Sequence, residues 1–219
     1  MAQQDPSLVG EVLEELVRPR YRALYVLARQ SLQPADAEDA VQSFLTRLFA
    51  SAKDRGFVDR LDPARGSLRA YLKTAFRHHL TNLHEMRVSQ KRGGGRKAVD
   101  VSEVEEQIAA HQDNPEQLFD RAWAASLFAD VLGHLKEEFE SGERRGPFQI
   151  VEQLLTFGAV EDYESLAARH AMSVPQLKAF VHRAKRRFRA LLRDRVEQTL
   201  GEGQDVDEEI RRLLEDLVA

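Results

Sequence analysis

The sequence predicts an all-α fold made of two small helical domains. Apolar residues recur at helical spacing along most of the chain, and no stretch shows the sustained alternation and β-branched enrichment of strands. Apolar residues make up 42% and charged residues 31% of the chain, which argues against both disorder and a membrane-embedded protein. At 219 residues, the chain is long enough for two domains that each bury a core.

The first helices are predicted from apolar faces near the N-terminus. Pro19 should break or kink the first helix, and the apolar spacing resumes at Tyr21 and continues to Ala28. A second helix is expected from Asp36 to about Ala52. The first apolar face comprises Val9, Val12, Leu13, Leu16 and Val17, and the face of the second helix comprises Val41, Phe44, Leu45, Leu48 and Phe49.

A loop, a long helix and a glycine-rich linker are predicted next. Turn signals place a loop at residues 53–66, and Ser67 is the expected N-cap of a helix that continues to about Arg92. Three consecutive glycines then end the helix, and residues 93–113 are typical of a flexible linker. We therefore expect a first domain at residues 1–92.

The second domain is expected at residues 114–219. Asn114 as N-cap, Pro115 at the first helical position and Gln117 at the third form a strong helix start. That helix should extend to about Glu140, and a shorter one should cover roughly residues 147–156.

Residues 163–192 have the spacing of a helix-turn-helix motif, with a short helix, a brief break and a long basic helix. Ser173 and Gln176 form a capping-box pattern at the start of the second helix. Two positions depart from the usual pattern, because Ala171 stands where a glycine is usual and His170 where an apolar residue is usual. Apolar contacts between the two helices are expected from Leu166, Met172, Leu177 and Phe180.

In such a motif the first turns of the second helix enter the major groove, and later basic residues bind phosphates. Gln176, Lys178 and Ala179 are therefore candidates for contacts with base edges. Gln176 has the alternative role of helix capping, and Arg187 and Arg189 have that of solvating a helix face. The full set of DNA-binding residues expected on this helix is Gln176, Lys178, Ala179, His182, Arg183, Lys185, Arg186 and Arg189, with Arg187 as a further phosphate candidate.

The charge is unevenly distributed, although the formal net charge is only -4. Segments 66–97 and 174–195 each hold eight Lys or Arg residues against one acid. Residues 99–120 hold seven acids and no Lys or Arg, and residues 196–219 hold eight acids and two Arg. Two cationic helices in an acidic chain favour a protein that binds a polyanion, over the alternative that both are merely solvated helix faces.

Two stretches together resemble bacterial RNA polymerase sigma factors. Leu166-Ala167, Met172-Ser173 and the His182–Lys185 segment resemble region four, which docks on the minus-thirty-five promoter element. The segment from Pro34 to Leu45 and the Arg65–Leu72 segment resemble region two. The resemblance is closest to the compact extracytoplasmic-function (ECF) class, which keeps only these two regions.

The resemblance implies core RNA polymerase, double-stranded promoter DNA and the locally melted minus-ten strand as partners. The loop at residues 54–66 would capture an unstacked minus-ten base. The polymerase-binding residues would be Asp36, Glu38, Asp39, Gln42 and Leu45, and the minus-ten residues would be Lys73, Arg77, His78, Asn82 and Arg87, roughly on one broad helix face. A purely structural role stays open for the acids at 36–39, because acids in a first helical turn favour the helix dipole.

Weaker similarities point to a subgroup of these factors that is associated with serine/threonine protein kinases. They lie in Lys91–Gly95, Arg121–Trp123 and Glu208–Arg211. A kinase or an anti-sigma factor is therefore a further expected partner. The acidic C-terminal segment, from about Gln198 to Ala219, is expected either to pack on the second domain or to screen the basic recognition helix.

We expect no catalysis, no cofactor and no metal. The chain has no cysteine, and His79 and His84 are five residues apart, which is the wrong spacing for one helical face. No secretory signal or membrane-spanning run is evident, so a cytoplasmic location is expected. Two alternatives remain open: a stand-alone helix-turn-helix regulator, and a helical interaction module whose basic faces bind acidic proteins.

Overall fold

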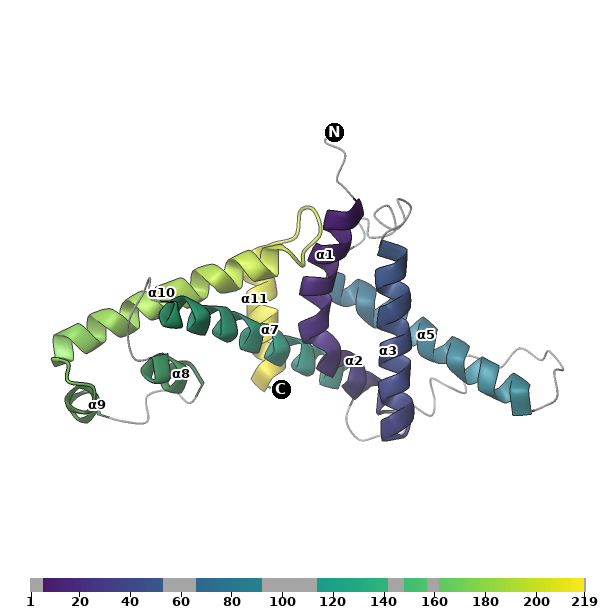
Figure 1. Ribbon diagram of the computed structural model, residues 1–219, viewed down its shortest axis with the longest axis horizontal. Helices are drawn as coiled ribbons and strands as arrows, with labels where there is room; N and C mark the ends of the chain where they lie inside the picture. Colours follow the sequence, from purple (N-terminus) through teal and green to yellow (C-terminus); the bar gives the residue numbers. More distant parts are fainter. Residues whose placement is uncertain (1–5, 53–65, 92–113, 142–147, 157–161, 219) are drawn as a thin grey trace. The chain divides into compact units, whose positions relative to one another are not determined.

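The computed structural model describes residues 6–52, 66–91, 114–141, 148–156 and 162–218 (Figure 1). Every regular element in these residues is a helix, so the predicted all-α class is confirmed for the described chain. The elements are α1 (Pro6–Val17), the 3-10 helix η1 (Arg18–Arg20), α2 (Tyr21–Ala28), α3 (Pro34–Ala52), α5 (Leu68–Lys91), α7 (Pro115–Glu140), α8 (Phe148–Thr156), α9 (Tyr163–Arg169), α10 (Val174–Glu197) and α11 (Val206–Val218).

The contacts divide the chain into two compact units. Unit 1 comprises Met1–Ser126 and Thr199–Ala219, and unit 2 comprises Leu127–Gln198. Helix α7 supplies its first half to unit 1 and its second half to unit 2. The predicted loop and linker lie outside the described residues, so the expected domain boundary at residues 93–113 stays a prediction.

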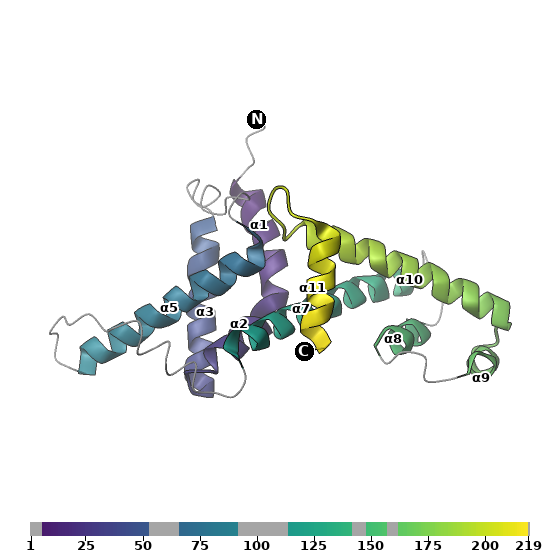
Figure 2. The same cartoon turned by 180° about the vertical axis from the view of Figure 1, so that it is seen from behind.

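The core of unit 1 forms where α1, α2, α3 and α5 pack together (Figures 1 and 2). Phe44 of α3 and Phe76 of α5 meet edge to face, with their ring centroids 5.0 Å apart. The η1 turn at Pro19 separates α1 from α2, as the sequence predicted. Val12 is half exposed, at 52%, so its expected place in the buried face of α1 is wrong; Leu13, Leu16 and Val17 form that face.

The first half of α7 is anchored in unit 1 by large aromatic side chains. Phe119 and Trp123 are buried and stack on each other. The guanidinium of Arg20, a fully buried residue, lies 5.7 Å from the Trp123 ring centroid and donates a 3.2 Å hydrogen bond to the Ser126 carbonyl. The arginine satisfies a backbone acceptor and stacks on the indole, which is a favourable way to bury a cation.

Helix α11 also belongs to unit 1. Its Leu213 is buried, and the amide of Leu68 at the start of α5 donates a 2.8 Å hydrogen bond to the carbonyl of Thr199. The acidic C-terminal segment, expected to pack on the domain at residues 114–219, lies in unit 1 with α5 and with the first half of α7, which belongs to that expected domain. The physical reason is a set of ion pairs between α11 and α5, described below.

Unit 2 is built around α10 and the second half of α7. Phe139 meets Phe148 of α8 and Phe180 of α10 edge to face, with ring centroids 6.0 Å and 5.5 Å apart. In both ribbon views α8 and α9 lie along the same side of α10 (Figures 1 and 2). The apolar positions that form this core were all predicted to be helical, and α7 ends at Glu140 as expected.

Candidate nucleic-acid interface

The turn between α9 and α10 is closed by local hydrogen bonds. Met172 donates from its amide to the Ala167 carbonyl (2.9 Å) and Ala171 to the Ala168 carbonyl (3.2 Å), the paired bonds of a Schellman C-cap. Ala171 takes the left-handed conformation that this motif requires, at φ 52°. The turn thus keeps the geometry that usually calls for glycine, although an alanine occupies the position.

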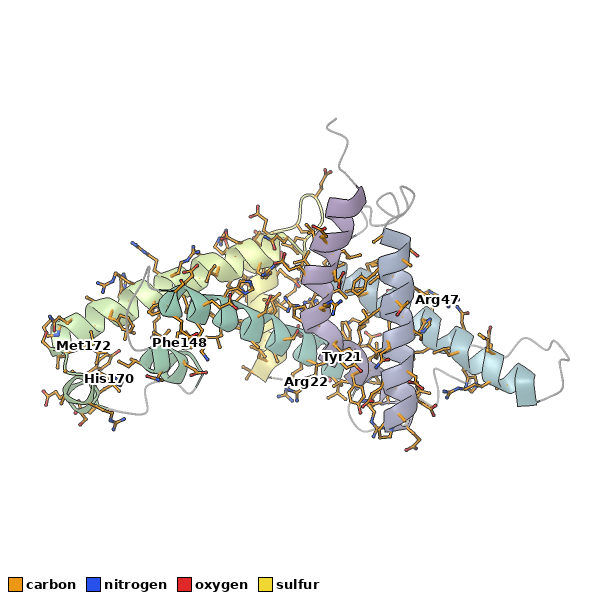
Figure 3. All side chains as sticks on the ribbon, in the orientation of Figure 1. Tyr21, Arg22, Arg47, Phe148, His170 and Met172 are labelled. Carbon is orange, nitrogen blue, oxygen red and sulfur yellow. The ribbon has the colours of Figure 1, made fainter. Side chains whose placement is uncertain are left out.

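Both helices of the motif have capped N-termini. The Asp162 carboxylate accepts hydrogen bonds from the amides of Glu164 (3.1 Å) and Ser165 (3.2 Å), which lowers the pKa of Asp162. At the start of α10, Ser173 Oγ accepts from the Gln176 amide and Gln176 Oε1 accepts from the Ser173 amide. The predicted capping box is therefore confirmed. Figure 3 shows His170 and Met172 at the junction of the two helices.

Helix α10 has one buried and one exposed side. Its buried residues are Leu177, Phe180, Val181, Ala184, Phe188, Leu192 and Val196. Most DNA-binding candidates lie on the other side, where Gln176, Lys178, Ala179, His182, Arg183, Arg186 and Arg189 are exposed and Lys185 is half buried. The helix repeat therefore brings the predicted set together on one solvent-facing surface, which we call the α10 basic face.

Cations of the α10 basic face are available to an external partner. Among the described residues, no hydrogen bond or ion pair engages the side chains of Arg183, Arg186 or Arg189. By contrast, Arg187 is held by Glu138 of α7, with Nε 2.9 Å from Oε2, and Arg195 lies 3.2 Å from Asp130. Arg187 therefore fastens α10 to α7 and is not a free phosphate contact.

The three candidates for base contacts differ in how far their side chains are already engaged within the protein. Gln176 uses its amide oxygen in the capping box, which leaves its amide NH2 group to donate to an external acceptor. The ammonium of Lys178 lies 5.7 Å from the centroid of the Tyr163 ring on α9, so this aromatic ring positions it. Ala179 is exposed on the same surface and would contact a base only through its methyl group.

The expected minus-ten residues on α5 do not share one face. Lys73 and Arg77 face α7, where Lys73 lies 2.7 Å from Asp120 and Arg77 lies 2.6 Å from Glu116. His78 and Asn82 are exposed on another side of the helix. Their helical positions explain the division, because residues 73 and 77 project about 100° or more away from residues 78 and 82.

An ion pair joins one of the expected minus-ten residues to one of the expected polymerase-binding residues. Arg87 near the end of α5 lies 2.6 Å from the carboxylate of Asp36, in the first turn of α3. Sequence reasoning assigned these residues to different partners, polymerase for Asp36 and DNA for Arg87. In the structure each is the other's partner.

The remaining polymerase candidates are on the outside of α3. Glu38, Asp39 and Gln42 are exposed, and Leu45 is half buried. Helix α3 begins at Pro34 instead of Asp36, since proline is favoured at a first helical position. The exposed acids therefore lie just inside the helix start, where they stabilise the helix dipole and also stay open to a basic partner.

Sequence reasoning missed the role of His79, which is buried between α3 and α5. Its Nε2 lies 2.9 Å from Ser43 Oγ, and its ring packs against Phe44 and Phe76. Burial lowers the pKa of His79, and the positive charge of Arg47, labelled on α3 in Figure 3, lowers this pKa further. The available signal was the position of His79 three residues after Phe76, on the same apolar face of α5.

The described residues hold no cluster of three His, Asp or Glu side chains that could bind a metal ion. None of the helices within the described ranges has the length and apolar character needed to cross a membrane. Comparison with protein-family models, curated proteins and solved structures finds no match to this chain.

Proposed function

We propose that this protein is a sigma-type transcription initiation factor that brings core RNA polymerase to promoter DNA in the cytoplasm. On this proposal the chain has two functional domains, a region-two domain and a region-four domain, joined by the segment at residues 93–113. The observation that carries the proposal is the α10 basic face, which directly follows a capped and closed helix-turn-helix junction and whose Arg183, Arg186 and Arg189 have no ion-pair partner among the described residues.

The geometry supports different roles for the first turns of α10 and for its later residues. Gln176, Lys178 and Ala179 lie in the first turns, which enter the major groove in a helix-turn-helix motif. Arg183, Arg186 and Arg189 lie further along, where arginines bind phosphates without reading sequence. The sequence motifs at 34–45 and 65–72 support the polymerase and minus-ten roles, and these roles rest on the resemblance to sigma factors.

A stand-alone operator-binding regulator is the second candidate, and one observation favours it. Among the described residues, Arg183, Arg186 and Arg189 of α10 have no ion-pair partner, whereas Lys73, Arg77 and Arg87 of the other basic helix are already paired with carboxylates of the chain. A protein that binds DNA through α10 alone would show this contrast.

Run-off transcription with core polymerase and selected promoter fragments separates the two candidates. A sigma factor forms a complex with core polymerase and directs initiation from a defined start, whereas a regulator binds the same DNA without directing initiation. Absence of both polymerase binding and initiation would refute the proposal.

Two substitutions test the roles on α10. Arg186→Ala should weaken binding to all promoter sequences alike and reduce the slope of log K against log salt by about 0.9, the loss of one phosphate contact. Lys178→Ala should change the preference at one or two minus-thirty-five positions, by roughly 1–3 kcal/mol at each. Equal, sequence-independent losses in both variants would contradict this division.

A further inference from the structure

Three cations on α5 form a regular row along the side that faces α7 and α11. Arg69, Lys73 and Arg77 are spaced four residues apart, so they lie above one another on the helix. Glu116 and Asp120 on α7 are also four residues apart and match the row from the other helix. We call these cations and the acids that contact them the α5 ladder.

Every cation of the α5 ladder has a carboxylate partner in the chain. Arg77 pairs with Glu116 at 2.6 Å and Lys73 with Asp120 at 2.7 Å. Arg69 is the most heavily engaged, with carboxylate oxygens at 2.7, 3.0 and 3.6 Å from its guanidinium. The acids that contact it are Asp216 and Glu209 of α11 and Asp120 of α7.

The ladder holds more acids than cations, and the exposure of its cations decreases from one end to the other. Four carboxylates face three cations, so this side of α5 is not cationic while α7 and α11 are in place. Side-chain exposure falls from 37% at Arg77 to 17% at Lys73 and 14% at Arg69. The end at Arg77 is therefore open to solvent, whereas the end at Arg69 is covered by α11.

The two elements that supply the acids differ in how firmly they are held. The first half of α7 is anchored by Phe119, Trp123 and Ala124, which are fully buried. Helix α11 has one fully buried apolar residue, Leu213, beside the half-buried Val206, Ile210 and Leu217, and its carboxylates form ion pairs with Arg69. Of the two, α11 is the element that can leave with less loss of buried apolar surface.

The ion pairs of α11 are also costly to form. Glu209 is buried, and this burial raises the pKa of its carboxyl despite the nearby Arg69 and Arg212. A buried carboxylate loses hydration that its ion pair only partly replaces. An external anion that binds Arg69 in a more exposed position would lose less hydration than Glu209 does. Such an anion can therefore compete with Glu209 for Arg69.

We propose that α11 is an intramolecular latch whose carboxylates occupy the cationic side of α5 in place of nucleic-acid phosphates. A single DNA strand would first meet Arg77 at the open end and gain Arg69 once α11 has left. This inference rests on the proposed nucleic-acid role of α5, but it concerns the free protein and does not involve polymerase.

The test measures binding of a labelled single-stranded oligonucleotide to the full chain by fluorescence anisotropy over a range of salt concentrations. The double variant Glu209→Gln with Asp216→Asn removes the two α11 acids that contact Arg69. We expect it to bind at least about threefold more tightly, with a salt slope larger by about 0.7, because one more cation contacts a phosphate.

A matched control changes the charge equally on the same helix. Glu208 and Glu215 are exposed on α11, and Glu208 pairs with Arg212 instead of with α5. The double variant Glu208→Gln with Glu215→Gln should bind within about twofold of the parent chain, since only long-range and screened charge is altered. Equal gains in both double variants would reduce the effect to net charge and overturn the latch.

Two more variants make the result independent of charge and of folding. Leu213→Ala weakens the apolar anchor of α11 without changing its charge, so it should also raise oligonucleotide affinity and speed hydrogen exchange in α11. Adding Arg69→Ala to the Glu209 and Asp216 double variant should abolish the gain. An unchanged affinity in Leu213→Ala despite faster exchange in α11, or a gain that persists without Arg69, would show that the latch does not cover a binding surface.

Failure of the latch and failure of the proposed function are distinguishable. If the chain directs transcription but the α11 variants bind the oligonucleotide no more tightly, the latch is refuted alone. If the gains appear but the chain neither binds core polymerase nor directs initiation, the latch stands and the sigma proposal is refuted.

Discussion

Replacing Ala171 with glycine should stabilise unit 2. Ala171 has a left-handed backbone at φ 52°, which costs a residue with a Cβ about 1–2 kcal/mol. Glycine avoids that cost but loses about 0.5–1 kcal/mol more backbone entropy on folding. The Ala171 side chain is exposed, so little packing is lost. The difference between these two terms is about 0–1.5 kcal/mol, so the expected net gain is about 0.7 kcal/mol, or a Tm increase of roughly 3–6 °C for the about 70 residues of unit 2.

The assay is thermal and urea unfolding, followed by circular dichroism. Ala168→Gly is the matched control, because Ala168 is also exposed but lies within α9 with helical backbone. This control should lose about 1 kcal/mol. If the turn is left-handed, the same Ala→Gly substitution should raise the free energy of unfolding at position 171 and lower it at position 168. If Ala171→Gly destabilises the protein as much as Ala168→Gly, the Schellman closure between α9 and α10 is wrong.

Two further predictions concern unit 1. Because the folded state lowers the pKa of His79 below its ordinary value of 6.5, the unfolded state binds more protons in the interval between the two values. The free energy of unfolding should therefore be largest above about pH 7 and fall as the pH drops through this interval. His79→Gln should remove this pH dependence, which is measured by urea unfolding at a series of pH values. A pH dependence that persists in the variant would assign it to other groups. Asp39→Lys should weaken core polymerase binding roughly tenfold while helicity stays constant, because Asp39 is exposed and, among the described residues, its side chain makes no hydrogen bond or ion pair. Unchanged binding, measured by co-purification with core polymerase, would show that Asp39 stabilises the helix dipole and does not contact polymerase.

Local sequence signals predicted most of the fold. Asn114 and Pro115 start α7, Ser173 and Gln176 cap α10, and Pro19 separates α1 from α2, all as expected. These features depend on hydrogen bonds and steric limits within a few residues, which a single sequence displays directly. Val12 was misplaced because its helical position borders the apolar face, and the packing of α1 in unit 1 decides which border residues are covered.

The pairing of charges was much less predictable. The sequence alone indicates a linker and a tail for the acids at residues 99–120 and in the C-terminal segment, and a phosphate-binding surface for the cations of α5. Which acid meets which cation depends on tertiary packing of segments far apart in sequence, as in the pair of Arg69 with Asp216. A partial signal existed, because acids 116 and 120 repeat the four-residue spacing of cations 73 and 77.

The contrast between the two basic helices has a consequence for how the protein would search DNA. If the proposed function holds, the arginines of the α10 basic face would supply the sequence-independent attraction that governs the first encounter with DNA. The cations of the α5 ladder are neutralised by its acids, and they would contribute to DNA binding only after the acids of α11 are displaced. Such an order suits a factor whose second site requires a separated strand, because open cations on α5 would bind phosphates of any duplex equally well. Part of the acidic excess of the chain is therefore already bound to cations of α5, through Glu116, Asp120, Glu209 and Asp216.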